Sequence, residues 1–392
     1  MPRNIRILIA KIVVSFVSAC LTLLAVELGA RTHDRFYRQT PNLDMFEFRQ
    51  QQPPPYRDAP YYSKDFVVES FQQPGGFDIP KGTRLVIPRD YEGKWFNIAG
   101  GLRVTEGQPE TFRHTVYVLG GSTVYSGEVP DAFTLPSQLQ LLFTEHYGDR
   151  YRVQNYGMTT VTSSQELERL RTIKLLAGDI VVFYDGVNDV FQEIYYARPA
   201  ETMVERNRRA MEEFSHVERL LIRLSEHSVF IKNWTSPINY VDVPSHLRDR
   251  EELAVLVHSL QGRYRRNIIS ARKYAHAHRA NFFHFLQPNL YTIRTPTTYE
   301  KKIRQNPNLY APPGMDGAFK LAYPLLREVS RNLRSSEEMN AFDLTDVLDE
   351  REPGQEHYLD ICHVTHAANL IIASAMFEEI APSLDTELPG SN

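Results

Sequence analysis

Short apolar runs that alternate with helical patterns constrain the fold of this chain more than any other feature of its sequence. From about residue 82 onwards, these runs have the residue types and length of β-strands. We expect strands over residues 83–87, 114–119, 151–155, 179–184, 281–286 and 341–344. The run 179–184 is apolar throughout, which is typical of a strand that is covered on both faces of a parallel sheet. The alternation therefore predicts an α/β domain with a mostly parallel sheet.

Helices are predicted between these strands and after the last of them. One is expected over residues 134–147, with Pro136 in its first turn, and one over 365–380, stopped by Pro382. A third should run from 163 to 176, begin at a capping box formed by Ser163 and Glu166, and end at Gly178.

About ninety residues separate the third and fourth central strands, and they have the pattern of charged helices. We expect helices over residues 200–231 and 247–278 within an insertion spanning 190–280. Two interpretations stay open. The insertion is either a cap that shapes the substrate site or a set of helices that pack against the sheet.

The N-terminus carries an uncharged apolar stretch from Ile12 to Val26. Basic residues flank it on both sides: Arg3, Arg6, Lys11, Arg31 and Arg35. We interpret it as a single-pass signal anchor with the N-terminus in the cytoplasm and the remaining chain outside the inner membrane, in the periplasm of a bacterial cell. A cleaved signal peptide and a buried core helix are the alternatives, and the sequence 17–20 resembles a lipoprotein box. The apolar residues that continue from 21 to 26 argue against cleavage there.

The predicted organisation has four parts. Residues 1–35 form the anchor, and residues 36–111 form a tether and N-terminal extension that is rich in Pro, Gln and Tyr between 40 and 80. Residues 112–382 form the α/β domain with the insertion 190–280, and residues 383–392 form a C-terminal tail.

Charge and composition exclude several classes of function. The formal net charge is −4 with both signs interspersed, so the sequence offers no basic field for nucleic acid. Two cysteines do not make a disulfide scaffold, and we expect no bond between Cys20 and Cys362. His276, His278 and His284 do not have convincing spacing for a metal site and are expected at the surface. We therefore expect neither a metal nor an organic cofactor.

Glycine or polar turns follow three of the predicted strands, and the carboxyl ends of parallel strands share one edge of a sheet. Ser122, Gly157 and Asn188 lie in these turns. A serine hydroxyl becomes an effective nucleophile when a base removes its proton and a third group orients that base, and Asp360 with His363 are spaced to do so. The backbone N–H groups of Ser122 and Gly157 and the amide of Asn188 are candidate donors to the oxyanion.

Four blocks in this order resemble the SGNH (GDSL-type) hydrolase superfamily, in its membrane-anchored bacterial branch. They are Gly120-Gly121-Ser122-Thr123, Asn155-Tyr156-Gly157, Gly186-Val187-Asn188-Asp189 and Asp360-Ile361-Cys362-His363. The resemblance covers residues 112–382 and implies a three-layer α/β/α sandwich around a five-stranded sheet. It implies nucleophile Ser122, base His363, orienting Asp360 and oxyanion donors Ser122, Gly157 and Asn188. Gly121 departs from the Asp of the GDSL form.

Each block alone is compatible with an ordinary turn, helix cap or ion pair, and their order at strand ends favours catalysis. The expected activity is hydrolysis of acyl esters, with O-acetyl groups on cell-surface or secreted polysaccharide, or another small ester, as substrate. Two alternatives stay open: a glycan O-acetyltransferase that uses the same triad, and a non-catalytic glycan-assembly protein with the same fold. Cys362 is expected to be a buried filler and His366 a surface residue.

Overall fold

The structure is a computed structural model, and it describes residues 3–37, 52, 54–72, 77–80, 83, 85–195, 249–304, 314–350 and 355–385. The chain divides into two compact units, one made of residues 1–47 and 203–242 and the other of residues 48–202 and 243–392. We describe each unit by itself. The predicted helix 200–231 and the last residues of the C-terminal tail lie outside the described residues.

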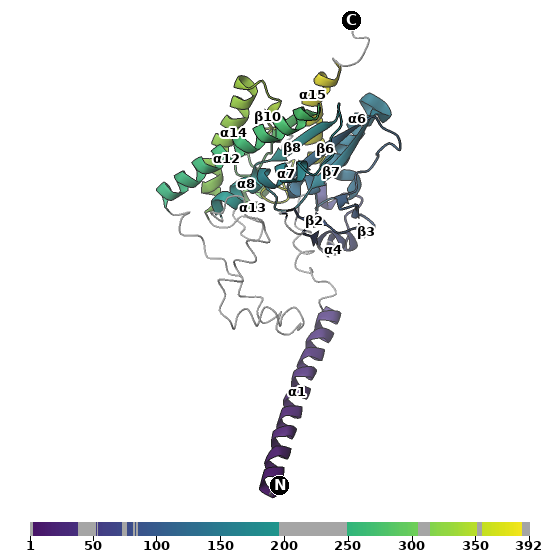
Figure 1. The fold of residues 1–392 in the computed structure, drawn as a ribbon, viewed down its shortest axis with the longest axis vertical. Coiled ribbons are helices and arrows are strands. Elements are labelled where there is room, and N and C mark those ends of the chain that lie inside the picture. The colour runs from purple at the N-terminus through teal and green to yellow at the C-terminus, as the bar shows by residue number, and fades with distance from the viewer. Residues whose placement is uncertain are drawn as a thin grey trace. The chain divides into compact units, whose positions relative to one another are not determined.

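The described part of the first unit is one long helix, α1 (Arg3–Tyr37). Its stretch Val13–Thr32 is 20 residues long with a mean hydropathy of 2.0, and nearly all of its side chains are exposed. Figure 1 shows α1 as a long continuous helix. The helix is long and apolar enough to cross a membrane. A membrane anchor and a signal sequence share this length and composition.

A single large sheet organises the second unit. Five parallel strands form its centre: β6 (His114–Gly120), β7 (Tyr151–Gly157), β8 (Ile180–Asp185), β9 (Asn281–Leu286) and β10 (Ala341–Asp343). Their order across the sheet is β10-β9-β8-β6-β7. All five were expected from the sequence within two residues at each end. β6, β8 and β9 are apolar runs that the sheet buries on both faces, whereas β7 alternates between buried and half-buried residues.

Three further strands extend this sheet beyond β7 and were not predicted as part of it. They are β5 (Leu102–Arg103), β4 (Asn97–Ala99) and β3 (Tyr91–Glu92), all antiparallel to their neighbours. The sheet therefore has eight strands rather than five. Strands of two or three residues at an edge carry too little apolar pattern to be recognised in a sequence.

The segment 36–111, expected to be a tether and N-terminal extension, thus contributes its second half to the α/β body. It also holds α3 (Pro54–Arg57) and α4 (Lys64–Gln72), together with a small antiparallel pair, β1 (Phe77–Asp78) and β2 (Ile87–Pro88). Among the described residues of the strand expected over 83–87, only Ile87 lies in a strand, β2, so this prediction is wrong over most of its length. Phe66 of α4 stacks on Phe96 with ring centroids 5.9 Å apart, so α4 is part of the packed unit.

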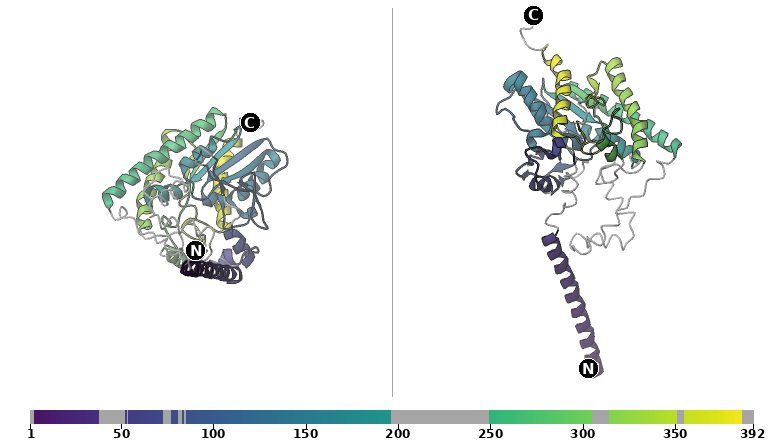
Figure 2. Two further views of the ribbon diagram at one scale, coloured as in Figure 1. Left: turned by 60° about the horizontal axis from the view of Figure 1, so that its bottom comes forward. Right: turned by 180° about the vertical axis from the view of Figure 1, so that it is seen from behind.

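Helices cover both faces of the sheet, as the three-layer prediction requires. On one face, α7 (Ser163–Leu170), α12 (Arg250–Ala277) and α14 (Met315–Ser336) pack against Leu119, Phe183 and their neighbours. On the other face, α6 (Leu135–Tyr147) and α15 (His366–Asp385) pack against Val118, Val182 and theirs. Alternate strand residues point to opposite faces, which gives the sheet two apolar cores. In the right-hand view of Figure 2, α15 (yellow) lies across the sheet beside α6.

Several helix predictions need correction. The capping box of α7 is formed by Thr162 and Gln165 rather than by Ser163 and Glu166, and α7 ends at Leu170. The last helix continues through Pro382, because a proline removes only one hydrogen bond and the buried Leu384 holds the final turn in the core. Helix α14 was not predicted.

The described end of the predicted insertion favours one of its two interpretations. Helix α12 matches the helix expected over 247–278, and it packs along the sheet with α7 and α14. It is a layer of the sandwich, not a cap. Short elements complete the unit: α5 (Ser122–Tyr125), η1 (Asp131–Phe133), η2 (Gly148–Arg150), α8 (Val187–Val190), the π-turn η3 (Phe191–Tyr195) and α13 (Thr298–Ile303).

Candidate active site

The order of the parallel strands creates a reversal of connections at β6. β6, the first parallel strand in the chain, lies between β7, the second, and β8, the third. The chain therefore moves to one side of β6 to form β7 and then crosses to the other side to form β8. Ligands of open parallel sheets bind outside the carboxyl ends of strands at such a point. Ser122, two residues after the end of β6, is the first residue of the short helix α5.

A chain of hydrogen bonds joins Ser122 to His363 and Asp360. The Oγ atom of Ser122 lies 2.8 Å from Nε2 of His363, and Nδ1 of His363 lies 2.6 Å from Oδ2 of Asp360. His363 and Asp360 are buried, at 8% and 3% exposure. The three residues predicted as nucleophile, base and orienting acid are therefore brought together in the order that proton transfer from serine requires.

Burial and the interaction between His363 and Asp360 shift the pKa values of both side chains. Burial is the largest single effect and disfavours the imidazolium form of His363, but Asp360, Cys362 and Glu128 together outweigh it and raise the pKa of His363 well above its usual value. Burial also opposes ionisation of Asp360, yet His363 and two backbone N–H groups lower the pKa of this carboxyl. Asp360 is thus an anion beside a strong base.

Hydrogen bonds to backbone groups fix the turn that carries His363. Oδ1 of Asp360 accepts hydrogen bonds from the N–H groups of Cys362 at 2.9 Å and His363 at 2.8 Å. Leu359 and His363 are joined by a backbone hydrogen bond of 2.8 Å, inside the bridge between Tyr358 and Val364. Cys362, expected as a buried filler, is 8% exposed.

A second carboxylate near His363 was missed in the sequence. Oε1 of Glu128 lies 3.8 Å from Nδ1 of His363, and Glu128 is one of the groups that raise the pKa of the imidazole. It lies in the loop after α5 and lines a small hollow beside the His363 ring with Thr123, Tyr184 and Asn369. An isolated Glu in a loop gives no signal in a single sequence.

The amide of Asn188 lies beside the nucleophile turn. Its Nδ2 donates to the carbonyl of Val161 at 2.8 Å, which fixes the side chain. A Cβ atom placed on Gly121 would lie 2.3 Å from this Nδ2. The departure from the GDSL pattern at this position therefore has a steric reason here, because an Asp at 121 would displace the Asn188 amide.

Gly157 occupies a position where its lack of a side chain is essential. A Cβ at this residue would lie 2.2 Å from the backbone N of Tyr125 and 2.6 Å from the carbonyl carbon of Val124. β7 and α5 can approach this closely only at glycine. The N–H of Gly157 donates to Oδ1 of Asn155 at 2.9 Å, so its role as an oxyanion donor stays a prediction.

Arg103 of β5 is a buried anchor that the sequence did not reveal. Its side chain is fully buried and forms an ion pair of 2.8 Å with Asp131. Its guanidinium also donates to the carbonyls of Tyr125, Ser126 and Val129 at 2.7 to 3.0 Å. The added strand β5 thereby holds the turn that follows α5, the helix of Ser122.

Three acidic side chains near Asn188 are buried: Asp185, Asp189 and Glu166. Asp189 accepts hydrogen bonds from the N–H and the hydroxyl of Ser163, the latter at 2.6 Å. Asp185 is hydrogen-bonded to Tyr264 and, at 3.1 Å, to His284. Burial and the neighbouring carboxylates of Asp185 and Asp189 raise the pKa of Glu166 well above its usual value. Glu166, expected in a capping box, is instead a buried acid with a raised pKa.

The histidines considered for a metal differ in their environments. His276 and His278 are exposed, whereas His284, also expected at the surface, is fully buried. His366 is likewise not a surface residue: it is half-buried, and its Nδ1 lies 3.1 Å from the hydroxyl of Tyr61. Among the described residues, Asp360, Cys362 and His363 bring ligand-type atoms within 4.8 Å of one another. Asp360 and His363 are hydrogen-bonded to each other, and His363 is hydrogen-bonded to Ser122, so the cluster fits proton transfer.

No family model and no curated protein sequence matches the chain. Solved structures match it over about two thirds of its length. One is a member of the lipolytic protein G-D-S-L family from Veillonella parvula, with 9% identity, a TM-score of 0.38, and coverage of 69% of this chain and 99% of that one. A GDSL-like lipase from Bacteroides thetaiotaomicron has 11% identity, a TM-score of 0.34, and coverage of 69% and 88%. A catalytic mutant of an acetylxylan esterase from Geobacillus stearothermophilus has 13% identity, a TM-score of 0.36, and coverage of 71% and 95%.

Proposed function

We propose that the chain is an SGNH-type serine hydrolase that cleaves carboxylic esters through an acyl-enzyme on Ser122. The observation that carries the proposal is the hydrogen-bonded chain from Asp360 through His363 to Ser122, at 2.6 and 2.8 Å. It stands at the connection reversal of a parallel sheet, where reactive groups of such folds gather.

The proposed reaction has two steps. Oγ of Ser122 attacks the ester carbonyl while Nε2 of His363 takes the hydroxyl proton, and the Asp360 carboxylate stabilises the imidazolium. The alcohol leaves with that proton, and water, activated by the same histidine, then releases the acid. The backbone N–H of Ser122 and the amide of Asn188 are the proposed donors to the oxyanion, each contributing about 3 kcal/mol to the transition state.

The proposed substrate is an O-acetyl ester on a cell-surface or secreted polysaccharide. The proposed location is the outer side of the inner membrane, with α1 as the anchor. The apolar stretch Val13–Thr32 and the basic residues before it support that orientation.

The test uses the full chain in detergent micelles and 4-nitrophenyl acetate as substrate. We expect Ser122→Ala to lower kcat by roughly 10⁴-fold or more. A fluorophosphonate should label Ser122 and no other residue, as read by peptide mass spectrometry. Ser335→Ala, which removes an exposed hydroxyl of α14, is the matched control and should behave as wild type.

If wild type and Ser122→Ala are equally inactive and Ser122 is not labelled, the proposal is contradicted. That result favours a non-catalytic protein. Adding a glycan acceptor distinguishes hydrolysis from acetyl transfer. If the acceptor captures the acetyl group in place of water, the enzyme is an acetyltransferase rather than a hydrolase.

A further inference from the structure

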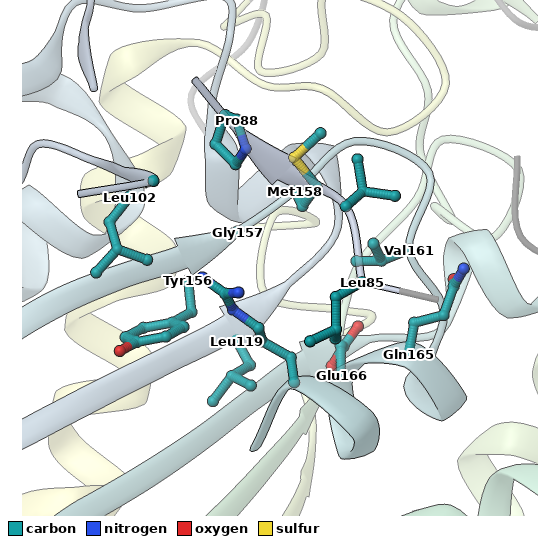
Figure 3. Close-up of a pocket in the computed structure, with 13 residues that line it drawn as sticks. Leu85, Pro88, Leu102, Leu119, Tyr156, Gly157, Met158, Val161, Gln165 and Glu166 are labelled. Carbon is teal, nitrogen blue, oxygen red and sulfur yellow. The ribbon is translucent and has the colours of Figure 1, made fainter. Parts of the chain in front are cut away.

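A hollow of about 430 Å³, part of which is open solvent, lies beside the turn that carries Ser122, on the α7 side of the sheet. Gly157, Met158 and Val161 form the wall that it shares with the site, and the carbonyl of Val161 also holds the Asn188 amide. Figure 3 shows Leu85, Leu119 and Tyr156 around the same space. The hollow therefore adjoins the position where a scissile ester would lie.

Arg169 of α7 gives this hollow a positive charge. Its guanidinium carbon lies 5.3 Å from the centre of the Tyr156 ring, and both residues line the hollow. Within the parts of the chain that the structure describes, no carboxylate forms an ion pair with Arg169. Its half-buried charge lies against the face of the Tyr156 ring.

One acidic side chain, Glu166, lines the hollow, and it does not cancel this charge. It is 1% exposed, and burial with the neighbouring carboxylates of Asp185 and Asp189 raises its pKa well above the usual value. A raised pKa favours the neutral form of a buried carboxyl group. The lining thus has one net positive charge on mostly apolar walls.

We propose that this hollow, named the Arg169 hollow, is a subsite for a carboxylate group of the substrate, held by the guanidinium of Arg169. A guanidinium presents paired N–H donors that match the two oxygens of a carboxylate. One cation with neutral neighbours suits a singly charged carboxylate better than a doubly charged phosphate. The inference rests on the proposed esterase function and narrows its substrate to acidic esters.

The carboxylate has two sources, the sugar and the acyl group, and two matched pairs of substrates distinguish them. The first pair is mono-acetylated methyl glucuronide and mono-acetylated methyl glucoside, with the acetyl group at the same position. The second pair is the 4-nitrophenyl monoesters of succinate and of butyrate. For the full chain in detergent, we expect the acidic member of one pair to be favoured in kcat/KM by roughly tenfold to a hundredfold.

Arg169→Gln should bring that ratio to about one, and Arg169→Lys should restore part of it. Arg171→Gln removes an exposed charge two residues away, and it should keep the wild-type ratio. A ratio between matched substrates is insensitive to partial loss of folded enzyme. Equal kcat/KM within both pairs, or an unchanged ratio in Arg169→Gln, overturns the proposal.

A binding measurement separates failure of this inference from failure of the esterase proposal. Hydrolysis of 4-nitrophenyl acetate and labelling of Ser122 report the esterase alone. If both fail, titration calorimetry with methyl glucuronide and with succinate decides on the hollow, comparing Ser122→Ala with Ser122→Ala/Arg169→Gln. Affinity for either acid that depends on Arg169 supports the subsite, and its absence for both overturns it.

Discussion

Asp360 holds His363 at two points: Oδ2 lies 2.6 Å from Nδ1 of the ring, and Oδ1 accepts the backbone N–H of the same residue at 2.8 Å. The carboxylate therefore fixes both the turn and the ring tautomer. In Asp360→Asn, the one remaining oxygen would satisfy the backbone, and the amide NH₂ would face Nδ1. The imidazole would then carry its proton on Nε2 and could not accept one from Ser122. We expect kcat for 4-nitrophenyl acetate to fall by roughly 10⁴-fold, with little change in thermal unfolding. A loss below tenfold would remove Asp360 from the mechanism.

The pH dependence of hydrolysis should report the raised pKa of His363. Only the neutral imidazole accepts a proton, so kcat/KM falls as the pH drops through this pKa. Because the pKa is raised, the acid limb should have its midpoint above the usual histidine value of about 6.5. Glu128→Gln removes a negative charge 3.8 Å from Nδ1 and should move that midpoint to lower pH. A profile that does not move excludes Glu128 as a charge partner.

Alanine at two glycines should separate effects on catalysis from effects on folding. In Gly121→Ala the new methyl meets the Asn188 amide, a side chain that can move. We expect kcat to fall by roughly 10²-fold with stability nearly unchanged. In Gly157→Ala the methyl meets the backbone of Val124 and Tyr125, so the free energy of unfolding should fall by about 1–3 kcal/mol or more. Urea unfolding and kcat, measured on both variants, test this contrast.

Glu166 should make stability depend on pH. Its pKa is raised in the folded state, so between the unfolded pKa of about 4.3 and the folded value the native protein binds more protons than the unfolded one. The free energy of unfolding therefore decreases as the pH rises, by up to about 1.4 kcal/mol per pH unit for one proton. Glu166→Gln removes this proton and should flatten the slope above pH 5 in urea titrations. A slope identical to that of wild type would mean that Glu166 is ionised in the folded protein.

Arg103 should be essential for stability although it lies outside the four sequence blocks. Arg103→Met leaves Asp131 buried without its ion-pair partner and frees three backbone carbonyls. We expect a loss of about 3–5 kcal/mol in the free energy of unfolding. Arg113→Met, an exposed residue just before β6, is the control and should change stability little. Comparable unfolding curves for the two variants would contradict the anchoring role.

The sequence was most informative where burial imposes a pattern. The run 179–184 became β8 and residues 281–286 became β9, because a central strand shows both faces to apolar layers. The glycine and polar turns after β6, β7 and β8 were predicted to share one edge, and the parallel registers bring them there. Ser122 could be paired with His363 in advance through the spacing of Asp360 and His363 and the resemblance to the SGNH blocks, since His363 itself lies well beyond the end of β10.

Features that depend on contacts between distant residues could not be predicted. Glu166 has the spacing of a capping residue, and only its burial near Asp185 and Asp189 raises its pKa. The stretch around Arg103 is too short for a strand pattern, so its pairing with β7 had no local signal. His366 looked like a surface residue because its partner, Tyr61, is 305 positions away.

The 241 positions between Ser122 and His363 also impose an order in time. During synthesis Ser122 leaves the ribosome early, whereas His363 leaves it late, after β8, β9 and β10 have been made. Until the turn at Asp360 has emerged and docked, the serine has no proton acceptor and the growing chain cannot attack an ester. The proposed hydrolase is therefore inactive during most of its own synthesis and gains activity only when its last strand and the turn beyond it are in place.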